Sequence, residues 1–157
     1  MIKTQRLIIR KFNKDDAEDI FNLSQEKNFG KWLPDQVYND IEQAEETLNM
    51  LISKYETEGF PYVLAVVEEK TGDLIGHVGL SKIEQGTEVG YAIGTKYQKN
   101  GFAKEALGAF IEWSKAYFGL KEILGVVDEK NIASERVLEA SGFAKASQCK
   151  GKVYYRI

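Results

Sequence analysis

Apolar residues in the N-terminal part of the chain recur with the periods of strands and helices. Loose alternation predicts a strand over residues 4–12, and Asn13 behind it is typical of a helix N-cap. Residues 25–38 carry aromatic side chains without a period and predict a loop. A pattern similar to a capping box then begins at Asn39, and one apolar stripe predicts a helix as far as Gly59.

The remainder of the chain mixes strand and helix patterns. Residues 62–68 and 74–83 flank a turn sequence and predict a hairpin, which residues 87–93 continue as a third antiparallel strand. The order of elements predicts an α+β fold around a mixed sheet. The other predicted elements are a helix over residues 103–118 ended by Gly119, a strand over 122–127, a helix over 133–141 and a closing hairpin around Gly151.

The segment after residue 93 joins a strand directly to the start of an amphipathic helix. Such a junction leaves backbone N–H groups free beside the positive end of the helix dipole, so a diphosphate is a natural occupant. Gly101 can adopt a positive φ and let phosphate oxygens approach, and the small Ala103 leaves the helix start open. An ordinary loop with one glycine explains the pattern equally well. The two familiar phosphate motifs, G-x-x-x-x-G-K-[ST] and G-x-G-x-x-G after a strand, are absent.

Three segments, in register with the predicted elements, resemble the GNAT acetyltransferases. QKNGFA at residues 98–103 resembles the family signature [RQ]-x-x-G-x-[GA], and it follows EVGYAI at 88–93. NIASERVLEASGF at 131–143 resembles the family segment N-x-x-S-x-x-[VL]-x-E-x-x-G-F. TQRLIIR at 4–10 is similar to the start of the subgroup related to ribosomal-protein N-terminal acetyltransferases. The resemblance implies an acyl-CoA N-acyltransferase fold of about seven strands, with a splayed parallel pair and about four helices.

The resemblance also implies acetyl-CoA as acetyl donor. The pantetheine arm would pair with Tyr91, Ala92 and Ile93, and an N–H near Ile93 would polarise the thioester carbonyl. The strand over 122–127 would be the second splayed strand, with Gly125 easing the separation. On sequence alone, an N-cap role explains Asn131 equally well. The family positions that contact pyrophosphate, pantetheine or sulfur fall on Gln98, Lys99, Asn100, Gly101, Phe102, Ala103, Asn131 and Ser134.

Acetyl transfer requires two proton transfers, and for each a residue must accept or donate the proton. The acceptor amine must be neutral to attack, and we predict Glu88 as its general base, where many relatives place a carboxylate. A solvent-facing strand glutamate is the equal alternative. Many relatives protonate the leaving thiolate with a tyrosine at the position of Leu138. Because leucine replaces this tyrosine, Ser134 or solvent is left as the acid that protonates the thiolate.

Composition and charge limit the domain count and the kinds of partner and metal site that fit this chain. The 157 residues fit one domain over residues 1–157, and a net charge of -3 argues against nucleic-acid and membrane partners. The lone Cys149 suits a reducing cytoplasm, and the apolar run near the N-terminus is too short and too interrupted to predict a signal peptide. His77, the only histidine, is expected to face solvent or make a satisfied polar contact, so no metal site is predicted.

The acceptor stays open at this stage. A peptide or protein N-terminus is one candidate, and a small amine such as a polyamine, amino acid or aminoglycoside is another. A coenzyme-A-binding module without catalysis is the third, which the missing tyrosine favours. Trp32, Leu33 and Tyr38 either wall an acceptor pocket or pack over the sheet edge. Relatives are often homodimers, which is an analogy only.

Overall fold

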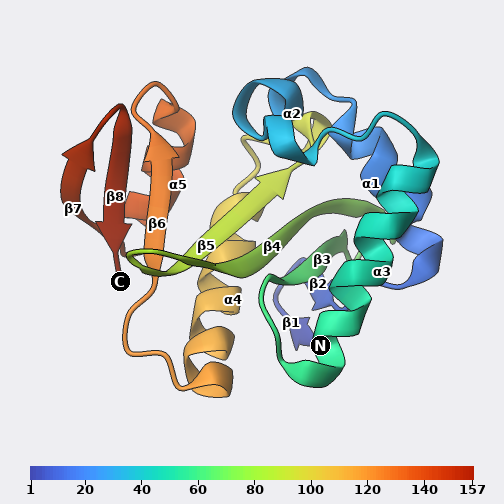
Figure 1. The fold of residues 1–157 in the computed structure, drawn as a ribbon, viewed down its shortest axis with the longest axis horizontal. Helices are drawn as coiled ribbons and strands as arrows, with labels where there is room; N and C mark the ends of the chain where they lie inside the picture. The colour runs from blue at the N-terminus through green and yellow to red at the C-terminus, as the bar shows by residue number, and fades with distance from the viewer.

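A computed structural model describes all residues, 1–157, as one eight-stranded mixed sheet with five α-helices (Figure 1). The strand order is β1-β2-β3-β4-β5-β6-β8-β7, and every neighbouring pair is antiparallel except β5 and β6. The strands are β1 Ile2–Lys3, β2 Leu7–Arg10, β3 Tyr62–Glu68, β4 Leu74–Ile83, β5 Gly86–Ile93, β6 Leu124–Asp128, β7 Ala144–Cys149 and β8 Lys152–Arg156. The α-helices are α1 Ala17–Ser24, α2 Lys27–Trp32, α3 Ile41–Thr57, α4 Phe102–Phe118 and α5 Ile132–Ala140.

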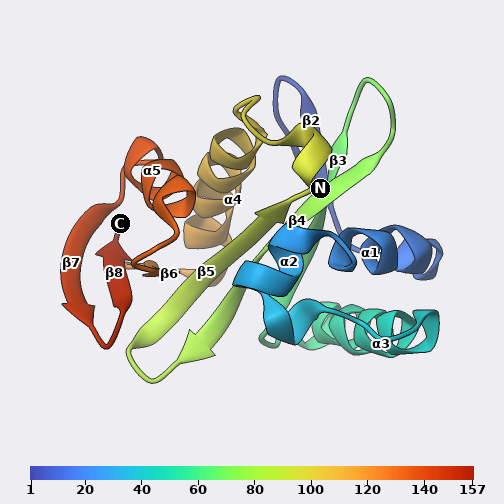
Figure 2. The same cartoon turned by 90° about the horizontal axis from the view of Figure 1, so that it is seen from above.

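The helices cover the two faces of the sheet (Figure 2). Helix α4 contacts β2, β4 and β5, and with them it encloses the larger apolar cluster, centred on Leu107 and Phe110. Helices α1 and α3 contact β4 and β3 on the opposite face, where Ala44 and Leu48 belong to a second cluster. The predicted α+β fold with a mixed, mostly antiparallel sheet is confirmed, with eight strands and five helices where about seven and about four were expected.

The N-terminal strand is shorter than predicted. Residues 4–12 were expected to form one strand, but only residues 7–10 do so, as β2, and the residues before them form a turn that follows β1. Thr4 closes the turn because its N–H donates to the carbonyl of Leu7 at 3.0 Å and its Oγ1 accepts from the N–H of Leu7 at 2.9 Å. Hydroxyl side chains compete with strand pairing in this way.

The loop predicted for residues 25–38 was wrong in part, because it contains the six-residue α2 and a 3₁₀ turn, η2, at Pro34–Gln36. A helix this short has no room for a full apolar stripe, and only Phe29 of α2 is buried. The predicted N-cap of α3 was one residue early. Asp40 caps the helix by accepting from the N–H of Gln43 at 2.9 Å.

The parallel pair opens directly after its first contact. Glu88 and Leu124 are the one registered pair between β5 and β6, and the strands separate beyond them. The splayed pair expected from the resemblance is therefore present, at the centre of the sheet (Figure 1).

Candidate active site

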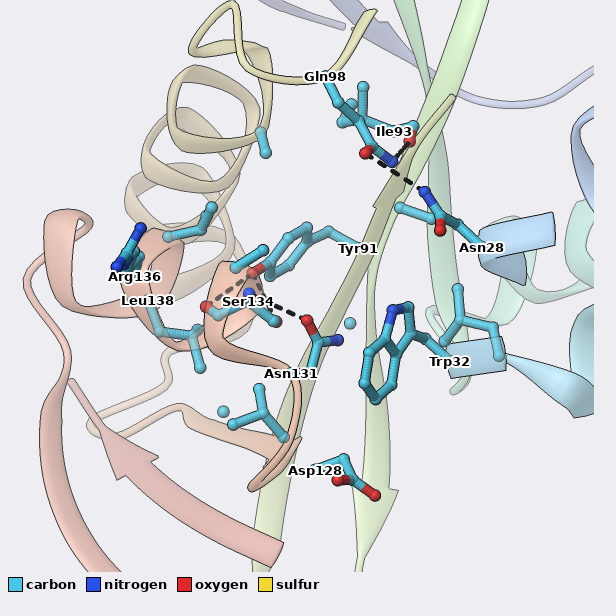
Figure 3. A pocket seen from close by; sticks show the side chains of 18 of the residues that line it. Asn28, Trp32, Tyr91, Ile93, Gln98, Asp128, Asn131, Ser134, Arg136 and Leu138 are labelled. Atoms are coloured by element: carbon cyan, nitrogen blue, oxygen red, sulfur yellow. Dashed lines mark hydrogen bonds between the residues drawn. The ribbon is translucent and has the colours of Figure 1, made fainter. Parts of the chain in front are cut away.

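A cavity of about 860 Å³ lies where β5 and β6 separate. Helix α2 supplies Asn28 and Trp32 on one side of β5, and α5 supplies Asn131 and Ser134 on the other (Figure 3). Except for Asn100, all the predicted site residues line this cavity: Glu88, Tyr91, Ala92, Ile93, Gln98, Lys99, Gly101, Phe102, Ala103, Asn131 and Ser134. Chain segments about 40 residues apart in sequence thus converge on one cleft.

The edge of β5 that faces the gap has backbone N–H groups that no neighbouring strand pairs with. The N–H of Gly94 donates to Ile75 of β4 at 2.8 Å, so by alternation the N–H groups of Ile93 and Tyr91 point toward the gap. The carbonyl of Ile93 accepts from Gln98 Nε2 at 2.9 Å on that same side. By the same alternation the N–H of Ala92 points to β4. A ligand arm entering the gap therefore meets Tyr91 and Ile93.

The loop before α4 has the backbone geometry that the glycine pattern predicts. Gly101 is the N-cap residue of α4 with φ of 81°, in the left-handed region that favours glycine. No side chain caps the helix, so its first N–H groups stay available beside the dipole. A Cβ at Gly101 would have one neighbour, Arg6 Nη2 at 3.4 Å. The loop therefore forms an open cradle that suits an anionic group.

Arg6 holds this loop in place, and our sequence analysis did not single it out. Its Nη1 donates to the carbonyl of Asn100 at 2.9 Å, and its Nε donates to Glu105 Oε2 at 2.7 Å. Its guanidinium also lies 4.4 Å from the centroid of the Phe102 ring. The segment TQRLIIR contained the signal, but no sequence pattern shows that Arg6 meets a loop 94 residues away.

Asn100 supports the loop from behind. Its side-chain amide donates to the carbonyls of Tyr97 and Gln98, at 3.3 and 3.0 Å, and its own carbonyl is held by Arg6. The structure thus places Asn100 outside the lining of the cleft.

The charge of the cleft favours an anion. Two carboxylates line it, Glu88 and Asp128, against a larger set of basic residues. That set is Lys99, Lys104, Lys130, Arg136 and Lys152. A locally basic cleft in a chain of net charge -3 concentrates negative ligands at this position.

Glu88 is half-buried at the closed end of the gap, where β5 still pairs with β6. Burial raises the pKa of its carboxyl above the usual value, and the nearby Lys152 partly opposes that rise. A raised pKa makes a carboxylate a better proton acceptor while it is still ionised at neutral pH. Its environment is therefore compatible with a general base.

Ser134 belongs to a small hydrogen-bonded group at the start of α5 (Figure 3). Its Oγ lies 2.9 Å from the hydroxyl of Tyr91, and its N–H donates to Asn131 Oδ1 at 3.2 Å. Asn131 is thus the N-cap of α5 and also lines the cleft. Burial raises the pKa of Tyr91 to about 12, so its hydroxyl is protonated at neutral pH. The pair Tyr91–Ser134 therefore offers a polar hydrogen inside the cleft.

Leu138, where many relatives have a tyrosine, is a core residue here. It is 1% exposed, and a Cβ on Gly125 would lie 2.8 Å from its Cδ2. Gly125 therefore makes room for Leu138, a different role from the expected easing of strand separation.

The structure also places Trp32, Leu33, Tyr38 and His77, the remaining residues discussed from the sequence. Trp32 and Leu33 line the large cleft, and Tyr38 lines a second, smaller cavity beside it. His77 also lines the second cavity. It was expected to face solvent or to make a satisfied polar contact, but it faces this cavity, and none of the side-chain hydrogen bonds involves its imidazole.

Comparison with known proteins agrees with this geometry. The family model described as acetyltransferase (GNAT) domain matches residues 6–144. The chain is 29% identical over 149 residues to the uncharacterized N-acetyltransferase YnaD of Bacillus subtilis (strain 168), which covers 92% of this chain and 82% of that protein. It is 25% identical over 143 residues to spermidine N(1)-acetyltransferase of Vibrio cholerae serotype O1, covering 89% and 80%. The crystal structure of the acetyltransferase (GNAT family) from Bacillus anthracis matches with a TM-score of 0.85 at 25% identity, over 99% of this chain and 96% of that one.

The fold and the family match define the class of protein, an acetyltransferase. The chain belongs to the GNAT acetyltransferase family and is an N-acetyltransferase. None of the five α-helices combines the length and the hydropathy that a membrane span requires.

Proposed function

We propose that this protein, as a single domain over residues 1–157, transfers an acetyl group from acetyl-CoA to a primary amine, in particular a peptide or protein N-terminal α-amino group. The observation that carries the proposal is the basic cleft between β5 and β6, which joins a free strand edge to an uncapped helix N-terminus. Those are the two backbone features that a pantetheine arm and a pyrophosphate need. Bound acetyl-CoA supplies an activated acetyl group as a thioester.

The residues of the chain itself bind and position this donor. The backbone of Tyr91 and Ile93 pairs with the arm, and the Ile93 N–H donates to the thioester carbonyl. The N–H groups around Gly101 hold the pyrophosphate, with Lys99 and Lys104 close by. Gln98 keeps the loop against the end of β5 through its bond to Ile93.

Glu88 removes the proton from the acceptor ammonium, directly or through water, so that the neutral amine can attack. An α-amino group, with a pKa of about 8, loses its proton more readily than lysine, with a pKa of about 10.4. Ser134, bonded to Tyr91, hydrogen-bonds the sulfur as it leaves.

A small-amine acceptor is the second candidate, because one relative is named a spermidine N(1)-acetyltransferase. A binding module without catalysis is the third, because Leu138 replaces the usual acid. Release of free thiol only in the presence of amines distinguishes an enzyme from a binder.

The first test is thermal unfolding with and without acetyl-CoA, since it needs no acceptor. A ligand at about 100 times its Kd adds about 2.7 kcal/mol to the free energy of unfolding. For a domain of this size we expect a rise in Tm of about 5–10 °C. NADH serves as the control nucleotide and should give no such rise. An unchanged Tm at millimolar acetyl-CoA would contradict the proposal.

A further inference from the structure

The second cavity, of about 390 Å³, adjoins the large cleft on the sheet face that α1 and α3 cover. The two cavities share two lining residues, Phe29 and Gly90. Gly90 lies two residues after Glu88 in β5, so both residues belong to the same face of the sheet. An amine held at Glu88 therefore has the second cavity next to it.

The lining of this cavity is half apolar and almost uncharged. Asp35, which is exposed, is the one carboxylate, and no lysine or arginine takes part. The large cleft, by contrast, carries basic residues on several elements. The apolar side chains around the second cavity are Phe12, Ile20, Leu23, Phe29, Met50, Leu51, Pro61 and Val63.

His77 is one of the uncharged polar residues of this lining, with Gln36, Tyr38, Thr47 and Ser81. It pairs with Ala92 across β4 and β5, and its ring centroid lies 6.1 Å from that of Phe29 in an edge arrangement. Burial lowers the pKa of its imidazole to about 4, so the ring is neutral at pH 7. The protein engages neither ring nitrogen in a side-chain hydrogen bond. The ring can therefore meet an uncharged polar group of a ligand without adding charge to the cavity.

Two paired glycines, Gly79 and Gly90, form the sheet surface between the cavities. A Cβ on Gly79 would lie 2.8 Å from Val63 Cα, so packing requires glycine there. A Cβ on Gly90 would meet nothing within 4 Å. Packing therefore does not explain glycine at position 90, and its missing side chain leaves the passage between the cavities open.

We propose that the second cavity is the pocket for the group beside the acceptor amine, and that it selects an uncharged, bulky apolar group. The substrate class is a peptide whose first residue is apolar, such as phenylalanine or leucine. This inference rests on the proposed transferase function. A polyamine would have to bury further ammonium groups beside apolar side chains with only the exposed Asp35 as partner, which is unfavourable.

The test compares thiol release from acetyl-CoA with short peptides that differ only in their first residue: phenylalanine, aspartate or lysine. Spermidine is the fourth acceptor. Burial of one large apolar side chain predicts a kcat/KM about 10-fold higher for the phenylalanine peptide than for the other three. A kcat/KM for spermidine equal to or above that of the phenylalanine peptide would overturn the pocket assignment and leave the transferase function standing. No thiol release with any amine would overturn both.

Two variants locate the preference in the cavity. Met50 lines the cavity and is 41% exposed, so Met50→Glu introduces a charge without disturbing the core. We expect about a 10-fold lower kcat/KM for the phenylalanine peptide, with unchanged acetyl-CoA affinity. Asn49→Glu, at the preceding exposed position of α3, is the matched control and should have no effect. Equal effects of the two variants would overturn the inference.

Gly90→Val and Asp35→Asn complete the set. The valine side chain at position 90 enters open space and should narrow the passage, so kcat/KM falls for the phenylalanine peptide more than for glycinamide. Asp35→Asn should leave the preference among the peptides unchanged. A 10-fold loss of activity in Asp35→Asn would instead indicate a cation site and overturn the inference.

Discussion

The two cavities beside β5 differ in the chemical groups that line them. The large cleft relies on backbone groups, the φ of Gly101, an uncapped helix end and basic side chains around them. The second cavity is lined by apolar side chains, mainly from α1, α3 and the start of β3, and by uncharged polar ones such as His77, Tyr38 and Thr47. This difference suggests that backbone geometry recognises the donor, which all members of the family share, while side chains select the acceptor. A change in either cavity should therefore affect one partner and spare the other.

The largest expected effect is at Glu88, which lines the large cleft two residues before Gly90, a residue that both cavities share. Glu88→Gln should lower kcat/KM by about 100-fold and remove the ascending limb of its pH profile, since a neutral amide cannot accept the proton. Glu84→Gln, in the exposed β4–β5 turn, is the matched control. If the ascending limb survives in Glu88→Gln, the base lies elsewhere.

The same variant gives a prediction about stability. The folded-state pKa of Glu88 is raised, so its ionisation costs stability as the pH rises from the unfolded value of 4.5 through the folded one. Above that window the penalty is constant, and Glu88→Gln removes it. The variant should therefore have a higher Tm than the natural protein at pH 7, and the Tm difference should vanish at pH 3.

A smaller effect, confined to the donor, is expected at Gly101. Gly101→Val places a β-branched residue at a φ of 81° and should raise the Kd for acetyl-CoA by about 10-fold or more. Gly72→Val is the matched control, because Gly72 has a φ of 77° in a turn with nothing within 4 Å of its missing Cβ. Both variants should lose similar stability, but only Gly101→Val should lose affinity in calorimetric titrations. Equal affinities would contradict the loop assignment.

Ser134→Ala should reduce kcat by about 2- to 10-fold with little change in the KM for acetyl-CoA, because one hydrogen bond to the leaving sulfur is lost. Ser141→Ala, at the other end of the same helix, removes a hydroxyl that bonds only to the Val137 carbonyl at 2.8 Å and should leave kcat unchanged. Steady-state kinetics of both variants decides between a catalytic and a structural hydroxyl.

The smallest effect is expected at Arg6, which acts on the donor loop through other residues. Arg6→Lys loses the forked contact with Asn100 and Glu105 and should raise the Kd for acetyl-CoA about threefold. Arg156→Lys changes the same residue type at an exposed ion pair with Glu122, 3.5 Å long, and should change nothing. An equal Kd in both variants would show that Arg6 does not position the loop.

The accuracy of the sequence predictions follows the same division between local and distant causes. The Asn13 N-cap and the left-handed Gly119 and Gly101 are correct because each depends on a few adjacent residues. The short α2 was missed because one buried residue, Phe29, gives no periodicity. The turn at the start of the predicted first strand was missed because it depends on Thr4, whose hydroxyl can favour either a strand or a turn.

By itself, the sequence determined the order of the elements apart from β1 and α2, the family and the strand–loop–helix segment of the cleft, because periodicity, caps and glycine conformations are local properties. Only the tertiary structure decided that Arg6 contacts a loop 94 residues away, that Gly125 makes room for Leu138, and that His77 lines an almost uncharged cavity next to the large cleft. Each of these depends on which distant side chains the sheet and helices bring together, and that packing leaves no periodic signal along the chain.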